Sequence, residues 1–211
     1  MEFLQYIGDR RGELLFKTGQ HLMLTGVSAT VAMLIGVPLG ILITRWRKSR
    51  GFVLGLVGVL QTIPSVAMLA LLMIPLGLGA KPAIAALILY ALLPIVVNTH
   101  AGLTGVDRNV LEAADGLGFT RHQRLWMVEL PLATPVIIAG IRTSTVITVG
   151  IAALSALIGA GGLGDFIFRG LATGNNHAIA LGVVAASSLA LLLGYGIGRV
   201  EKTLKRRLHQ R

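Results

Sequence analysis

Cysteine is absent from this chain, and charged and aromatic residues are scarce. Without cysteine the chain holds neither disulfides nor thiolate metal sites. Charged residues make up 13% and aromatic residues 5% of the sequence, whereas hydrophobic residues reach 54%, which is not the composition of a soluble domain. Acidic residues are the rarer charge, with 9 Asp and Glu against 19 Lys and Arg. The basic residues lie in short breaks between apolar runs and in the tail, without interleaved aromatics, which argues against a nucleic-acid partner.

The motifs of catalysis are also missing. No G-x-x-x-x-G-K-[ST] sequence offers a phosphate cradle for ATP. The five histidines are scattered, and none has a Glu partner at metal-ligand spacing. Residues 159–164 fit G-x-G-x-x-G, but they follow an apolar run instead of a strand, and no acidic residue lies about twenty positions further on. We interpret them as a Gly-rich turn where backbones pack closely, and we expect no enzyme active site, no metal site and no bound cofactor in this chain.

Long apolar runs dominate the sequence. A helix needs about 20 apolar residues to cross a bilayer, and backbone groups in lipid must bond within the segment. Residues 159–176 are too Gly-rich and polar to cross, and Pro94 interrupts the third run. We therefore predict an all-α integral membrane protein with about five transmembrane helices (six are possible), at residues 22–44, 52–74, 83–103, 132–158 and 178–197.

The ends of the chain differ from this membrane domain, which we place at residues 21–200. Residues 1–20 mix apolar and charged side chains, as in a short helix lying on the membrane surface. A signal peptide is the alternative, but the following apolar run is too long and no small-x-small cleavage site follows it. Residues 201–211 form a basic tail. Basic residues are retained in the cytoplasm, so with five spans the breaks at 45–50 and 107–130 and the tail are cytoplasmic.

The longest polar interval, residues 107–130, predicts two short helices joined at an elbow. Asp107 offers a side-chain oxygen to cap the first helix, and Gly118 supplies the positive φ of a helix exit. Thr120 and Gln123 fit a capping box for the second helix. Pro131 either stops that helix or begins the next one.

This elbow resembles the EAA motif of the permeases of ABC importers. The matching positions are Glu112, Ala113, Ala114, Gly118, Leu130 and Pro131, with Val128 where the family more often has Ile. The resemblance implies that the elbow docks into an ATPase subunit and couples it to transport. Glu112 is then the polar anchor, Ala113 and Ala114 the small surface that permits close approach, and Gly118 the fixed bend.

Two further stretches, residues 128–142 and 153–170, resemble permeases for osmoprotectants such as glycine betaine, carnitine and choline. The resemblance implies two ATPase subunits that bind ATP and Mg, a second copy of the permease or a similar chain, and an extracytoplasmic solute-binding protein. It also implies location in the bacterial cytoplasmic membrane. Importers of methionine or other amino acids have a related Gly-rich stretch and are the first alternative. A stand-alone secondary transporter is the second, but the chain shows neither a convincing inverted repeat nor several buried ionisable residues.

Three polar residues within the spans are candidates for the translocation pathway or a gate. Arg142 is the one ionisable residue well inside a span, and such groups usually face a cavity or a partner. Its long side chain also allows it to reach the cytoplasmic edge instead. Gln61 and Asn98 either line the pathway or form hydrogen bonds that hold helices together.

Overall fold

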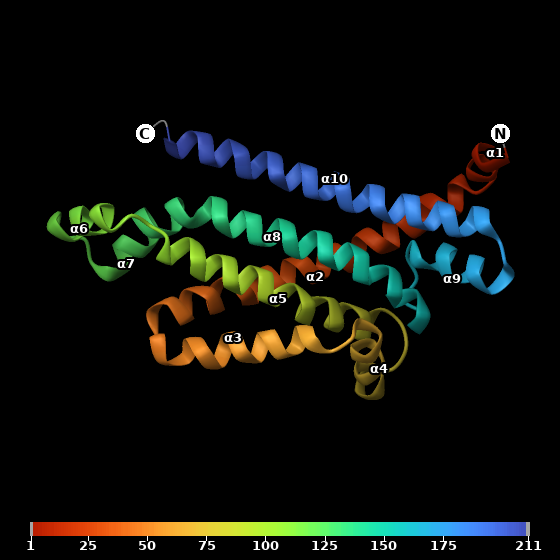
Figure 1. The fold of residues 1–211 in the computed structure, drawn as a ribbon, viewed down its shortest axis with the longest axis horizontal. Coiled ribbons are helices and arrows are strands. Elements are labelled where there is room, and N and C mark those ends of the chain that lie inside the picture. Colours follow the sequence, from red (N-terminus) through yellow and green to blue (C-terminus); the bar gives the residue numbers. More distant parts are fainter. Residues whose placement is uncertain (1, 210–211) are drawn as a thin grey trace.

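The computed structural model describes residues 2–209, which are helical almost throughout and contain no strand in the described part. Figure 1 shows the long helices running side by side, with shorter helices at both ends of the bundle. The elements in chain order are α1 (Glu2–Asp9), α2 (Arg11–Arg45), α3 (Arg47–Thr62), α4 (Ser65–Leu76), α5 (Ala80–Thr104), α6 (Arg108–Gly116), α7 (Arg121–Arg124), the π-helical turn η1 (Leu125–Glu129), α8 (Leu130–Ala152), the 3₁₀ segment η2 (Ala153–Ile158), α9 (Gly164–Thr173) and α10 (Asn176–His209).

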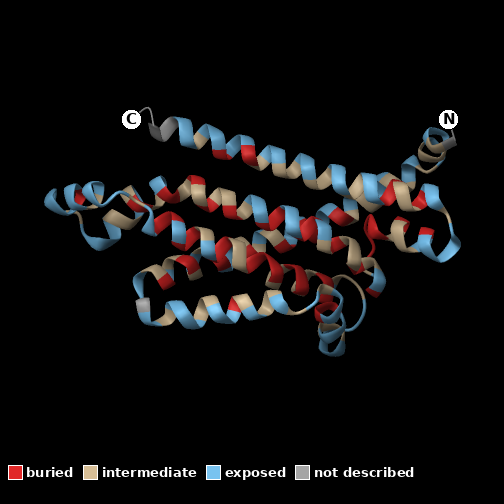
Figure 2. Ribbon diagram, in the orientation of Figure 1, coloured by how far each residue is buried: buried red, intermediate tan, exposed pale blue. Residues whose placement is uncertain are grey.

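Helix α5 is the centre of the bundle, and it packs against α2 on one side and α8 on the other. Small residues allow α2 and α8 to lie close to α5. A Cβ atom placed on Gly40 of α2 would lie 2.5 Å from the Cβ of Thr99, and one on Gly140 of α8 would lie 2.5 Å from the Cβ of Asn98. Buried residues concentrate along these contacts (Figure 2). Close backbone packing through small residues is the usual way in which membrane helices associate.

The membrane-spanning prediction is confirmed, with one correction. Among residues 2–209, four helices are long and apolar enough to cross a membrane, and a fifth crossing requires counting α3 and α4 together. The second predicted span, residues 52–74, is therefore not one straight helix, because α3 and α4 meet at an angle of 100°. Pro64 causes the break. It disfavours helical geometry at the residue before it, and Ile63 is extended, with φ −69° and ψ 126°.

The predicted boundaries at the two ends also shift. The first helix break lies at Arg10 instead of residue 20, so residues 11–20 are the first turns of α2. The basic tail is the end of α10 as far as His209. The basic break after the first span is short, because Arg47 already begins α3. Pro94 does not interrupt α5, which is continuous from Ala80 to Thr104.

The topology places the three basic regions at one end of the molecule. The α2–α3 connection, the elbow of α6 and α7 and the end of α10 lie together at the left of Figure 1. Helices α1, α4 and α9 lie at the opposite end. This grouping is what five crossings require, and the cytoplasmic location of this end stays a prediction from the positive-inside rule.

Candidate functional site

The elbow forms as its sequence predicts. The Asp107 carboxylate accepts a hydrogen bond of 2.8 Å from the backbone N–H of Asn109, which caps α6. After α6, the Gly118 N–H donates to the Asp115 carbonyl and the Phe119 N–H to the Ala114 carbonyl, at 3.0 and 3.1 Å. These are the two bonds of a Schellman motif, which needs a residue of positive φ, and Gly118 has φ +79°.

The second half of the elbow begins with the predicted capping box. The Thr120 N–H donates to the Gln123 side chain at 2.9 Å, and the Gln123 N–H donates to the Thr120 hydroxyl at 3.3 Å. Of the two roles expected for Pro131, stopping the second helix or beginning the next one, the structure shows the second. Helix α7 continues through η1 into α8, and Pro131, which has no N–H to donate, lies in the first turn of α8 directly after the π turn. The elbow is therefore continuous with the fourth span.

The residues of the EAA motif separate into exposed and packed positions. Glu112 and Ala113 are exposed, and Glu112 forms a surface ion pair of 2.9 Å with Arg108. Ala114 is only 5% exposed, so its side chain packs within this subunit and does not offer a docking surface in this conformation. Leu130 packs on a cluster around Leu103, Ala133 and Ile137, whereas Pro131 is exposed.

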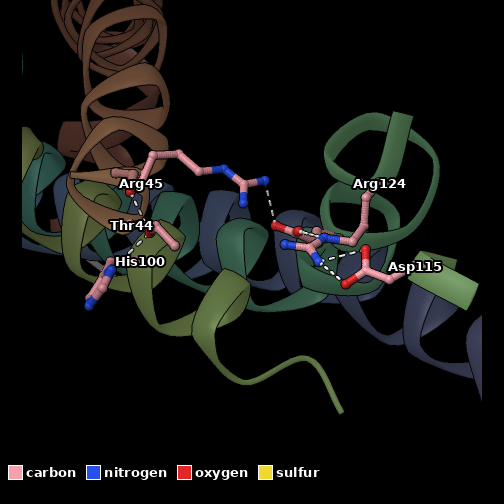
Figure 3. Close-up of polar contacts among 7 residues, drawn as sticks. Thr44, Arg45, His100, Asp115 and Arg124 are labelled. Carbon is pink, nitrogen blue, oxygen red and sulfur yellow. Dashed lines mark hydrogen bonds and ion pairs between the residues drawn. The ribbon is translucent and has the colours of Figure 1, made fainter. Parts of the chain in front are cut away.

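A buried carboxylate that the sequence analysis did not single out lies beside the elbow. Glu129, at the end of η1, is 3% exposed. Its Oε2 accepts a hydrogen bond of 2.8 Å from Nη2 of Arg45, at the end of α2, and its Oε1 accepts one of 2.9 Å from Nε of Arg124. Arg124 Nη1 also contacts both carboxylate oxygens of Asp115, at 2.8 and 2.5 Å. Two acidic and two basic residues thus form a charge-balanced network (Figure 3).

The π-helical turn η1 explains how Glu129 reaches both arginines. Five residues along an α-helix turn by about 500°, so Arg124 and Glu129 would lie about 140° apart around its surface. A π turn, with hydrogen bonds five residues apart, brings residues at this spacing close to one face. The Leu130 N–H donates to the Leu125 carbonyl in this way. In the sequence, the only indication of this contact is that an acidic residue, Glu129, directly precedes Leu130 and Pro131.

A second polar contact connects α2 and α5 beside this network. The Thr44 hydroxyl donates to the Gly40 carbonyl at 2.8 Å, so at its other contact it accepts a hydrogen bond of 2.8 Å from Nδ1 of His100 (Figure 3). The Thr44–His100 contact and the Glu129 network line one cleft of about 500 Å³. The end of α2 is therefore polar where it meets the elbow.

Gln61 lies at the bend between α3 and α4. Pro94 has no N–H, so the Tyr90 carbonyl four residues earlier loses its helical partner. The Gln61 side-chain amide donates to that carbonyl at 2.9 Å, and the Tyr90 hydroxyl in turn donates to the Ile63 carbonyl at the bend. These bonds satisfy groups that Pro94 and Pro64 leave free. Gln61 thus has a packing role in this structure, and a role in the pathway stays a prediction.

The other two candidate pathway residues also have partners within the subunit. The Asn98 side chain donates to the Pro94 carbonyl at 2.8 Å, where α5 crosses α8. Arg142 Nη1 lies 3.2 Å from Oε2 of Glu201 on α10, and Glu201 also pairs with Lys205 at 3.0 Å. Arg142 therefore joins α8 to α10, and its role as a gate likewise stays a prediction.

The Gly-rich residues 159–164 lie at the opposite end from the elbow. They follow the 3₁₀ segment η2 and precede α9, instead of joining a strand to a helix. The Leu163 N–H donates to Nδ1 of His21 at 3.2 Å, and Nε2 of His21 contacts the Val149 carbonyl at 3.0 Å. Gly162 donates to the side chain of Gln20 at 3.2 Å. These bonds hold the turn against α2, and a Cβ atom on Gly164 would lie 1.8 Å from the Ala153 carbonyl oxygen, so backbones pack closely here, as interpreted from the sequence.

Comparison with known proteins identifies the family. Residues 36–210 match the family described as "Binding-protein-dependent transport system inner membrane component". The chain belongs to this family. It is accordingly a multi-pass membrane permease of the ABC importer type, which confirms the family resemblance seen at the elbow.

Two relatives and one solved structure are similar along nearly the whole chain. The glycine betaine/carnitine/choline transport system permease protein OpuCB of Bacillus subtilis (strain 168) is 45% identical, over 96% of this chain and 92% of its own. The osmoprotectant import permease protein OsmW of Salmonella typhimurium is 41% identical, over 97% of both chains. A chain of the MetNI methionine ABC transporter, in an inward-facing conformation, has a TM-score of 0.82 at 26% identity, over 90% of this chain and 95% of its own.

Proposed function

We propose that this chain is the permease subunit of an ATP-driven importer for osmoprotectants such as glycine betaine, carnitine or choline. The observation that carries the proposal is the 45% identity, over 96% of the chain, to a permease named for these three solutes. The relative named for osmoprotectant import, at 41% identity, points to the same substrate class.

The elbow is the part of the permease that contacts the ATPase subunits and transmits their movement to the spans. Two ATPase subunits, which bind ATP and Mg, dock on the elbows of two permease chains, either two copies of this one or one copy and a similar chain. Glu112 and Ala113 are exposed for that contact. Because α7, η1 and α8 are continuous, closure of the ATPases displaces the fourth span together with the elbow.

Selection of the solute belongs to a separate extracytoplasmic binding protein. A quaternary ammonium group is usually held by an aromatic cage. Aromatic residues make up only 5% of this chain, and Tyr90 is buried, with 5% of its surface exposed. The spans then provide a passage with weak affinity, and the binding protein provides the specificity.

Uptake in a strain that lacks its own osmoprotectant importers tests this function. The chain is expressed with its ATPase and binding protein, and uptake of radiolabelled glycine betaine, carnitine, choline, proline and methionine is compared. We expect uptake of the quaternary ammonium solutes, and none when the ATPase carries an inactive P-loop. Uptake of methionine alone would instead favour the amino-acid importer, to which the MetNI likeness points. Uptake without any ATPase would overturn the proposal in favour of a secondary transporter.

A further inference from the structure

The elbow has little apolar contact with the rest of the subunit. Within α6 and α7, both fully described, Ala114 is the one buried residue. The following turn contributes Leu125, which packs with Leu130 on the cluster around Ile137. Apart from its helical connection to α8, the elbow therefore depends mainly on polar contacts for its position relative to the other spans.

The ion-pair network provides this link in three steps. Arg124 and Asp115 join the two halves of the elbow, because Asp115 lies on α6 and Arg124 on α7. Arg124 and Glu129 join the elbow to the start of α8. Glu129 and Arg45 then join the start of α8 to the end of α2.

The contact between Arg45 and Glu129 differs from the others because it joins two elements that are not neighbours in the sequence. Helix α8 follows the elbow covalently, whereas α2 lies more than sixty residues earlier in the sequence. Each oxygen of Glu129 has its own arginine, so the carboxylate holds α2 and the elbow at the same time. The Glu129 side chain is only 4% exposed, although that of Arg45 is 31% exposed, so the pair is screened by water less than an ion pair between two exposed side chains.

We propose that Glu129 is a positioning residue that makes the end of α2 move with the elbow when the ATPase subunits close. The proposal rests on the proposed function, because it assigns to Glu129 a part in that same coupling. Without this carboxylate, the arginines at positions 45 and 124 face each other without a bridging charge. The elbow then moves with α8 but not with α2, and ATP is hydrolysed with little transport.

The first test replaces Glu129 by Gln in the assembled transporter, reconstituted in liposomes with its ATPase and binding protein. We expect ATPase subunits to remain bound and ATP hydrolysis to continue, while solute uptake per ATP hydrolysed falls at least tenfold. Arg45→Gln is expected to give the same result, whereas Arg45→Lys, which keeps the charge, recovers part of the uptake. An unchanged ratio of uptake to hydrolysis in both Gln variants overturns the proposal.

Glu13→Gln is the control. The Glu13 carboxylate also binds two arginines, Arg10 and Arg169, but it lies near the start of α2, at the end of the molecule opposite the elbow. We expect its ratio of uptake to hydrolysis to stay at the wild-type value. An equal loss of that ratio in Glu13→Gln would show a general effect of removing a carboxylate that bridges two arginines and would contradict the specific role of Glu129.

A covalent replacement of the ion pair measures the same link between α2 and the elbow in a second way. The natural sequence has no cysteine, so Arg45→Cys with Glu129→Cys provides two unique thiols. Joining them with a short bifunctional thiol reagent is expected to restore uptake that the uncrosslinked double variant has lost. Inhibition by the crosslink would show that α2 and the elbow have to separate, and would overturn the proposal. Failure of the wild-type complex to take up solute would instead contradict the proposed function.

Discussion

Replacing Gly118 by Ala provides a direct test of how the elbow is held in shape. A Cβ atom at this position meets no atom within 4 Å, so the substitution causes no clash. Its effect comes from the backbone, because Gly118 has φ +79° and an L-residue in the left-handed region costs about 1–2 kcal/mol. Asn tolerates this region better than other non-glycine residues, so Gly118→Asn is expected to cost less than Gly118→Ala.

Gly116, two residues earlier, is the matched control. It is the last residue of α6, and a Cβ atom there also meets no atom within 4 Å. Ala within a helix is favoured over Gly by about 0.5–1 kcal/mol, so Gly116→Ala stabilises the elbow slightly. Both variants replace Gly by Ala, but Gly118→Ala is expected to destabilise the elbow, whereas Gly116→Ala is expected to stabilise it.

The assay is hydrogen exchange of the backbone amides of residues 108–124, together with titration of the ATPase subunit. Gly118→Ala should speed exchange, and it should weaken ATPase binding by at most about 5- to 30-fold, since 1.4 kcal/mol corresponds to a factor of ten. The full loss of ATPase affinity is expected only if the elbow is marginally stable when no ATPase subunit is bound, as its small buried surface suggests. Equal exchange rates and affinities in Gly118→Ala and Gly116→Ala would refute the conformational argument.

Three further substitutions test other parts of the structure. Gly140→Ala places a Cβ atom 2.5 Å from that of Asn98, so we expect a loss of about 1–3 kcal/mol in stability, measured by thermal unfolding in detergent. Gly150→Ala in the same helix meets no atom within 4 Å and should be at least as stable as the wild type; equal unfolding of both variants would contradict the close α5–α8 contact. Gln61→Leu leaves a carbonyl at the α3–α4 bend without its partner and should cost about 1–3 kcal/mol, whereas altered uptake at unchanged stability would support the pathway role. Glu112→Lys should abolish uptake without preventing membrane insertion, and normal uptake at normal expression would argue against docking through this residue.

The elbow could be predicted from sequence because its ends depend on local chemistry. The Asp107 cap, the Gly118 exit and the Thr120–Gln123 capping box each involve residues within a few positions of one another. The apolar runs could be recognised equally well, because a span needs about 20 apolar residues and its backbone groups must form their hydrogen bonds within the segment. These features give the fold class and the position of the candidate site.

The contacts that join distant elements could not be predicted in the same way. Pro64 breaks a helix while Pro94 does not, and at each site the free carbonyl is satisfied from a neighbouring helix: Tyr90 donates to Ile63 and Gln61 donates to Tyr90. The network around Glu129 depends on a π turn and on Arg45, which is distant in sequence. Nothing in the sequence near Glu129 indicates which basic residue it meets.

The continuous run Arg121–Ile158 has a mechanical consequence. Its 38 residues extend over about 57 Å at the rise of an α-helix. A tilt of about 5° at the elbow would therefore displace the opposite end by about 5 Å, roughly the pitch of one helical turn. Such amplification allows a small closing movement among the ATPases to open or shut a passage on the far side of the bilayer.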